Sequence, residues 1–357
     1  MLRRLSARPL EEVSELNRMH SLILRFVFLF LFLLAFTLSR LARAAELPLV
    51  RIAHGAFSEK IAIMWLGVEQ GIFRKHGVNV EVINIRSGPQ TMAALASGDI
   101  QVAFTIPGSV VSAATGGFDV ALFAGIVNKA DGDFIAAPQI RTAEDLKGKR
   151  LGVQSVGGGV WSMAMLALEH LGLEPNRDKI TVMIIGDSPV LAQSLESGGI
   201  EATYLNYVYS RSLKDKGFPV LLDLGKAPIP YQGLAAATRR SYIKQNPQII
   251  DALMRSFVET VAFIHKPFNK EFVVRALMKN LWLKNPQDAE IGYQALQWLY
   301  HLDVKPTIPG IQNMARLLAL GNPKIKTIKL EDVVDDAPWQ RLDKSGFYRE
   351  LTANAKK

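Results

Sequence analysis

The sequence predicts an α/β fold made of two similar lobes, and three observations support this prediction. Short apolar strands alternate with amphipathic helices from residue 49 to residue 205, which is typical of α/β proteins. The same order of strands and helices then occurs a second time, and Pro89–Ile100 and Pro189–Ile200 share five identities at an offset of 100 residues. From residue 242 onward the pattern is mostly helical.

The first 44 residues predict a secretory signal peptide. An arginine-rich segment, Met1–Arg25, precedes the apolar run Phe26–Leu38, and Ala42 and Ala44 place small residues at positions −3 and −1 of a cleavage site. The run is shorter than the ~20 apolar residues that span a membrane, so we expect cleavage after Ala44 rather than a retained anchor, and a periplasmic protein. Met19 is an alternative start, because it lies closer to the apolar run.

Composition narrows the classes of function. The leader holds seven arginines and three glutamates, so its removal lowers the net charge from +9 to +5. No concentrated basic run with interleaved aromatic residues is present, so we expect no nucleic-acid partner. The absence of cysteine excludes disulfides, thiol catalysis and cysteine-ligated zinc, and the six histidines show no metal-binding spacing. We therefore expect no metal and no cofactor.

The first lobe begins with a buried strand and a helix. Ile61, Met64, Trp65 and Val68 repeat at helical spacing and form one apolar face. Residues 78–85 alternate between apolar and polar side chains, as a half-buried strand does. We expect strands at residues 49–54, 78–85, 100–105 and 120–127 and helices at 60–71, 89–97 and 107–114.

The second lobe repeats this order around a glycine turn, Gly157–Gly159. Glycine lets the backbone approach a ligand closely, and the free N–H groups of the next helix's first turn then point at that ligand. A plain strand-to-helix turn is the alternative. We expect strands at residues 150–154, 180–185 and 201–205 and helices at 160–170 and 188–197.

Two segments are interpreted as crossings between the lobes, namely residues 136–138 and 224–233. They divide the mature chain into lobe one (45–140), lobe two (141–225) and a return to lobe one (226–357), with a hinged cleft between the lobes. C-terminal helices are expected at 247–265, 270–283, 286–302 and 310–320. We expect their aromatic residues Trp282, Trp298 and Tyr300 in the core.

Several short motifs, in this order and spacing, carry a family resemblance: Gly71–Phe73, Leu95–Ile100, Asp145–Val153, Leu195–Gly198, Asp332–Asp335 and Lys344–Phe347. With them the mature chain resembles the substrate-binding proteins of ABC importers for nitrate, sulfonates, taurine and thiamine-type pyrimidines. The resemblance implies a two-lobed periplasmic binding protein of type II. Each lobe would be a mixed sheet flanked by helices, with a C-terminal helical extension on lobe one.

The resemblance also implies a function without catalysis. A small organic molecule, anionic or aromatic, would bind in the cleft by hinge closure and pass to a membrane permease with its ATPase. The protein would be a monomer and would meet the membrane only through the permease. The alternatives are the ligand-binding subunit of a sensory system, a scavenging protein, and an enzyme similar to those of thiamine-pyrimidine synthesis. That enzyme group depends on a cysteine-rich motif that is absent here.

The candidate ligand-binding residues follow the carboxyl ends of the strands, where open α/β sheets bind ligands. Backbone N–H groups and hydroxyls would bind polar groups, whereas Phe57 and Trp161 would flank a flat ligand. For Ser109 and Asp187 the alternative role is helix capping. For Phe57 and Trp161 the alternative is packing inside their own lobe. In the turn where sulfonate binders of this family tend to place hydroxyls, this chain has glycines. This difference favours a larger, partly apolar ligand. The set is Gly55, Phe57, Pro107, Gly108, Ser109, Gly158, Gly159, Val160, Trp161, Asp187 and Asn206.

Overall fold

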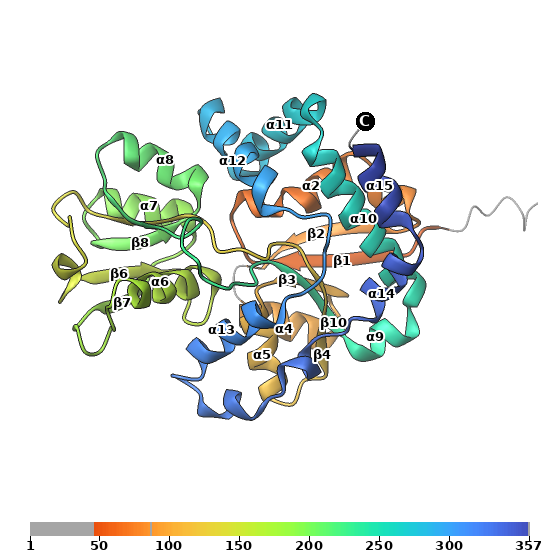
Figure 1. Cartoon of the computed structure of the whole chain (residues 1–357), viewed down its shortest axis with the longest axis horizontal. Coiled ribbons are helices and arrows are strands. Elements are labelled where there is room, and N and C mark those ends of the chain that lie inside the picture. Colours follow the sequence, from red (N-terminus) through yellow and green to blue (C-terminus); the bar gives the residue numbers. More distant parts are fainter. Residues whose placement is uncertain (1–45, 86–87, 356–357) are drawn as a thin grey trace, which may run out of the picture. The chain divides into compact units, whose positions relative to one another are not determined.

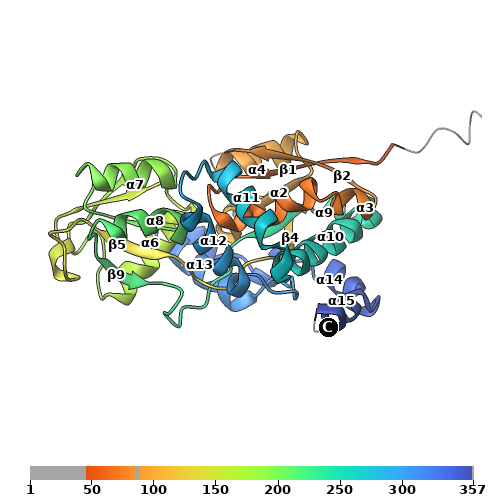
Figure 2. The ribbon, with the colours of Figure 1, turned by 90° about the horizontal axis from the view of Figure 1, so that it is seen from above.

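The computed structural model describes residues 46–85 and 88–355, so the expected signal peptide lies outside the described residues. From Pro48 onward the chain forms one unit with two five-stranded mixed sheets, each flanked by helices (Figures 1 and 2). The predicted α/β class and the two lobes are confirmed. Within the described ranges, no helix combines the length and apolar character that a membrane span requires.

The first sheet has the strand order β2-β1-β3-β10-β4. Its first three strands are parallel, and β10 is antiparallel to both of its neighbours. The strands are β1 (Leu49–His54), β2 (Asn79–Asn84), β3 (Val102–Thr105), β4 (Val120–Gly125) and β10 (Ala235–Arg239). The connecting helices are η1 (Glu59–Ile61), α2 (Ala62–Glu69), α3 (Ile72–Lys75), α4 (Gly88–Ser97) and α5 (Pro107–Thr115).

The second sheet repeats this plan in the order β7-β6-β8-β5-β9, with β5 antiparallel to β8 and β9. The strands are β5 (Asp133–Ala136), β6 (Arg150–Val153), β7 (Thr181–Ile184), β8 (Ala202–Leu205) and β9 (Val220–Asp223). The helices are η2 (Glu144–Leu146), α6 (Gly159–His170), α7 (Ser188–Glu196) and α8 (Tyr207–Asp215). Figure 1 shows α6, α7 and α8 around this sheet.

In each sheet, the antiparallel strand directly follows a segment that crosses from the other lobe. Residues 126–132 lead from β4 into β5, and residues 224–234 lead from β9 back into β10. The two crossings pair with each other, since the Gly233 N–H donates to the Val127 carbonyl at 2.6 Å and the Leu224 N–H donates to the Gly132 carbonyl at 2.9 Å. We expected the first crossing at residues 136–138 and the lobe boundary at residue 140. The crossing lies earlier in the chain, because β5 already pairs within the second sheet.

The C-terminal helices pack mainly beside the first sheet. Phe257 of α10 lies against Phe104 and Phe123 of that sheet, and α14 and α15 pack against α10. Two helices also contact the second lobe, α12 through α8 and α13 through an Arg316–Glu169 ion pair. The elements are α9 (Arg240–Gln245), α10 (Pro247–His265), η3 (Pro267–Asn269), α11 (Lys270–Leu281), α12 (Pro286–Leu299), α13 (Ile308–Leu318), η4 (Pro323–Thr327), η5 (Leu330–Val333), α14 (Ala337–Lys344) and α15 (Phe347–Ala355).

Of the three aromatic residues that we expected in the core, two pack there and one does not. Tyr300 is buried and its hydroxyl donates to the Lys60 carbonyl at 2.8 Å, and Trp298 packs partly buried against the same core. The prediction for Trp282 is wrong, since this side chain is 71% exposed. Helix α11 ends at Leu281, and Trp282 then adopts a left-handed backbone (φ 53°, ψ 34°) that turns it away from the apolar face of the helix.

Candidate functional site

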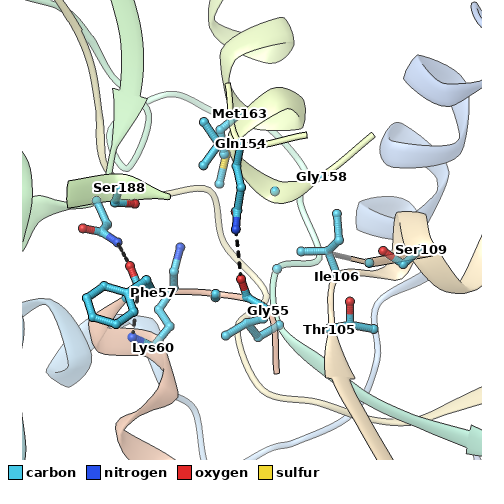
Figure 3. A pocket seen from close by; sticks show the side chains of 18 of the residues that line it. Gly55, Phe57, Lys60, Thr105, Ile106, Ser109, Gln154, Gly158, Met163 and Ser188 are labelled. Carbon is cyan, nitrogen blue, oxygen red and sulfur yellow. Dashed lines mark hydrogen bonds between the residues drawn. The ribbon is translucent and has the colours of Figure 1, made fainter. Parts of the chain in front are cut away.

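A cavity of about 90 Å³ lies between the carboxyl ends of the strands of the two sheets, and we call it the cleft cavity (Figure 3). Both sheets and the second crossing contribute to its wall, so it is formed only when the two lobes are together. Its lining residues are Gly55–Ser58, Lys60, Gly88, Phe104–Ile106, Ser109, Gln154, Ser155, Gly158–Val160, Met163, Ser188, Tyr204, Asn206, Tyr231, Gly233 and Leu234.

Four helices begin at the cleft cavity. The N-cap positions of α5, α6, α7 and α8 are Ile106, Gly158, Asp187 and Asn206, and none of these side chains caps its own helix. The first-turn N–H groups of each helix are therefore not satisfied by a cap, and each helix N-terminus carries a partial positive charge. This arrangement suits a polar or anionic ligand group without a cationic side chain.

Two amide side chains of the second lobe hold the loop that follows β1. Gln154 Nε2 donates to the Gly55 carbonyl, and Asn206 Nδ2 donates to the Phe57 carbonyl, each at 3.2 Å. Figure 3 shows the Gln154 side chain reaching across to Gly55. The loop is thus fixed from the opposite lobe at two points beside the cavity.

A buried ion pair lies under the cleft cavity. The ammonium group of Lys60 is 2.8 Å from the Asp131 carboxylate and donates to the Tyr204 hydroxyl at 3.3 Å. Asp131 belongs to the first crossing and Tyr204 to β8, so Lys60 joins the first lobe, a crossing and the second lobe. Among the described residues that line the cavity, Lys60 is the only one with a cationic side chain, and Asp131 neutralises it.

Glu59, next to Lys60, is fully buried. Burial raises the pKa of its carboxyl to about 7, although Lys60 opposes the shift. One of its oxygens accepts from the Ser58 hydroxyl at 3.0 Å, and the other has no partner within the described residues. Burial with so few partners therefore favours the protonated form of this carboxyl below about pH 7.

Seven of the eleven predicted binding residues line the cleft cavity: Gly55, Phe57, Ser109, Gly158, Gly159, Val160 and Asn206. Their contact with a ligand stays a prediction. The walls combine apolar side chains, among them Phe104, Ile106 and Met163, with the hydroxyls of Ser109, Ser155 and Ser188.

The other four, Pro107, Gly108, Trp161 and Asp187, are not part of the cavity wall. A Cβ atom on Gly108 would lie 3.1 Å from Leu318 Cδ1, so this glycine faces α13. Trp161 packs against the core of the second lobe, which was the alternative for this residue. Asp187 occupies the N-cap position of α7 but its side chain makes no capping bond, so the alternative role of helix capping is wrong for this residue.

Several lining residues were not predicted, notably Lys60, Gln154, Tyr204 and Tyr231. Gln154 directly follows β6, so the rule on strand ends would have found it. Tyr204 lies inside a strand and Tyr231 in a crossing, and neither position carries a local signal of ligand contact. Within the described ranges, no group of three or more histidine or acidic side chains is placed to hold a metal ion.

Comparison with known proteins identifies the family of this chain. A family model described as NMT1/THI5 like matches residues 58–267, more than half of the chain. The taurine-binding periplasmic protein of Escherichia coli strain K12 is 24% identical over 221 residues, which are 60% of this chain and 63% of that protein. The chain thus matches less than two-thirds of the length of this curated relative.

Solved structures share the fold. The periplasmic aliphatic sulphonate binding protein of Escherichia coli superposes with a TM-score of 0.65 at 20% identity, covering 83% of this chain and 99% of that one. The periplasmic nitrate-binding protein of Synechocystis PCC 6803 gives a TM-score of 0.66 at 16% identity, covering 84% and 89%. The chain therefore has the periplasmic binding protein fold.

Proposed function

Because the chain belongs to the NMT1/THI5-like family, we propose that it is the periplasmic solute-binding protein of an ABC importer. The observation that carries this proposal is the cleft cavity, at which four uncapped helix N-termini converge from two lobes. Relatives whose names state taurine, sulphonate and nitrate binding support the same assignment. The chain would be exported through its signal peptide and act as a monomer without catalysis.

The ligand is a small organic molecule with a polar or anionic group and an apolar or aromatic part. The polar group meets the N–H groups at the starts of α5 and α6 and the hydroxyls beside them. The apolar part lies against Phe57, Phe104 and Met163. Lobe closure buries the ligand, and a permease with its ATPase receives it when the lobes open.

A thermal-shift screen tests this proposal. The full chain is expressed and exported, and the protein from the periplasmic fraction is unfolded and refolded to remove any bound ligand. The panel contains taurine, alkyl and aryl sulfonates, nitrate, pyrimidines, aromatic acids and phthalate-like diacids. A ligand at 100 times its Kd stabilises the fold by about 2.7 kcal/mol, which raises Tm by several degrees.

A matched pair of variants locates the site. Gly159→Val adds bulk to the cleft wall at a position where a Cβ atom meets Ile106 Cγ2 at an ordinary 3.6 Å. Gly321→Val makes the same change beyond the end of α13, where a Cβ atom meets only the Leu318 carbonyl oxygen at 3.8 Å. We expect the ligand-induced shift to disappear in Gly159→Val and to persist in Gly321→Val. A panel without any stabilising compound, or equal shifts in both variants, contradicts the proposal.

A further inference from the structure

A second concave surface lies on the first lobe, outside the cleft cavity, and we call it the outer groove. Its volume is about 690 Å³, within the range of small-molecule sites. The groove lies between the end of β1, helix α2 and the end of α11, and α2 and α11 are neighbours in Figure 1. Phe57 lines both the outer groove and the cleft cavity.

Aromatic side chains form much of the groove wall. Trp65, Trp282 and Phe57 line it, and the ring centroids of Phe57 and Trp282 are 4.9 Å apart. Trp282 is 71% exposed, so most of its ring has no protein partner. Its left-handed backbone would suit glycine better than tryptophan. An exposed large apolar ring at such a position points to a role outside the protein's own packing.

A mostly buried histidine lines the same groove. His54 is only 5% exposed, and its Nδ1 lies 3.0 Å from the Ala56 carbonyl oxygen. Because a carbonyl only accepts, Nδ1 carries the ring proton, and Nε2 is left as an acceptor. No hydrogen bond to Nε2 is formed within the described part of the chain, and His54 is one of the groove's lining residues. Burial lowers the pKa of His54 to about 4, so the ring stays neutral at physiological pH.

We propose that the outer groove is a second binding site, for a planar aromatic molecule that carries one N–H or O–H donor. The ring of the ligand stacks on Trp282, and its donor meets His54 Nε2. Indole and phenol are the simplest members of this class. The Glu69–Lys279 ion pair, 2.9 Å long, joins α2 to α11 at the rim and adds no net charge to the site, which fits an uncharged ligand.

The test compares indole with 1-methylindole, which has nearly the same shape but no N–H donor. Binding to the full, exported chain is measured by saturation-transfer NMR and by tryptophan fluorescence. We expect saturable binding of indole, with 1-methylindole at least tenfold weaker. Lack of saturable indole binding, or equal affinities of the two probes for the wild-type protein, would overturn the proposal.

Three variants assign the site. Trp282→Gly removes the ring and relieves the left-handed backbone, and we expect it to weaken both probes while Tm stays nearly unchanged. His54→Phe keeps an aromatic ring but removes the acceptor, so indole affinity should fall to that of 1-methylindole. Gly159→Val alters only the cleft cavity and should leave indole binding intact. If indole binding is lost in Gly159→Val but kept in Trp282→Gly, the ligand occupies the cleft and the proposal fails.

Discussion

Lys60 and Asp131 form a buried ion pair near the cleft, with side chains 12% and 0% exposed. Tyr204 completes the group, because its hydroxyl lies within hydrogen-bond distance of both charges. The other oxygen of Asp131 has no partner among the described residues, so its charge depends on Lys60. The pair therefore holds three parts of the fold together at one point, and each charge needs the other.

Lys60→Met should destabilise the fold strongly, because it leaves the Asp131 charge buried and unpaired. We expect a loss of about 3–5 kcal/mol in the free energy of unfolding, measured by urea denaturation. Lys216→Met is the control, since this side chain is 51% exposed and pairs with Glu196 on the surface. It should cost less than about 1 kcal/mol. Equal losses of unfolding free energy in the two variants would show that the buried pair stabilises the fold no more than a surface pair does.

Glu59→Gln should change how stability depends on pH. The pKa of this buried carboxyl is about 7 in the folded chain, against 4.5 when exposed, so the folded state binds the proton more tightly. The wild type should therefore lose stability relative to Glu59→Gln as pH rises from 4.5 to about 7, with a constant difference above that pH. The full difference is on the order of 3 kcal/mol. Parallel unfolding profiles of the two proteins between pH 4.5 and 8 would contradict the assignment.

Single residues were predicted well only where the local sequence determines their position. The loop after β1 and the turn before α6 follow strand ends, and Gly55, Phe57 and Gly158 of these segments line the cleft cavity, while their contact with a ligand stays a prediction. Trp282 was misplaced because helical spacing assigned it to the buried face, whereas the helix ends one residue earlier. Which side of a helix's first turn meets the cavity is set by tertiary packing, and Gly108 and Trp161 lie outside the cavity wall for that reason.

At the scale of elements, glycines in strand β6 and helix α6 serve different purposes. A Cβ atom on Gly152 of β6 would lie 2.5 Å from Ile200 Cδ1 and 2.9 Å from Leu191 Cδ2, so the strand packs directly against its neighbours. Gly159 begins α6 and has room for a methyl group toward the cleft. The first glycine is a packing requirement, and the second leaves space for a ligand.

Gly152→Ala should therefore lower the free energy of unfolding by about 1–3 kcal/mol, as overpacked cores do. Gly159→Ala should leave stability unchanged or raise it slightly, because alanine favours helix over glycine. Thermal and urea unfolding of both proteins measure these values. The assignment of the two roles is contradicted if Gly159→Ala destabilises the fold as much as Gly152→Ala does.

The repeated strands and helices were predicted from hydrophobic pattern alone, and β1, the start of β6 and α10 agree closely with the structure. Strands β5, β9 and β10 were missed, and with β5 the position of the first crossing. All three are short and pair only with strands distant in sequence, β5 with β8 and β9, and β10 with β3 and β4. A local pattern holds no information about such partners.

At the scale of the whole molecule, two sheets joined by paired crossings form two lobes that can close on a ligand. The crossings run side by side, with the Gly233–Val127 and Leu224–Gly132 hydrogen bonds between them, and they connect the lobes covalently. Gln154 and Asn206 add bonds from the second lobe to the loop after β1. A ligand that bridges the lobes adds to these contacts and should favour the closed arrangement.

The most direct test measures the distance between the lobes with and without ligand. The chain has no cysteine, so Gln70→Cys on the first lobe and Asn176→Cys on the second give two unique spin-label sites. Double electron–electron resonance is recorded on the refolded, ligand-free protein and again after saturation with the most strongly stabilising compound of the panel. We predict that ligand narrows the distance distribution and shifts it to one closed value, and that Gly159→Val abolishes the shift. An unchanged distribution at saturation would contradict closure on a solute.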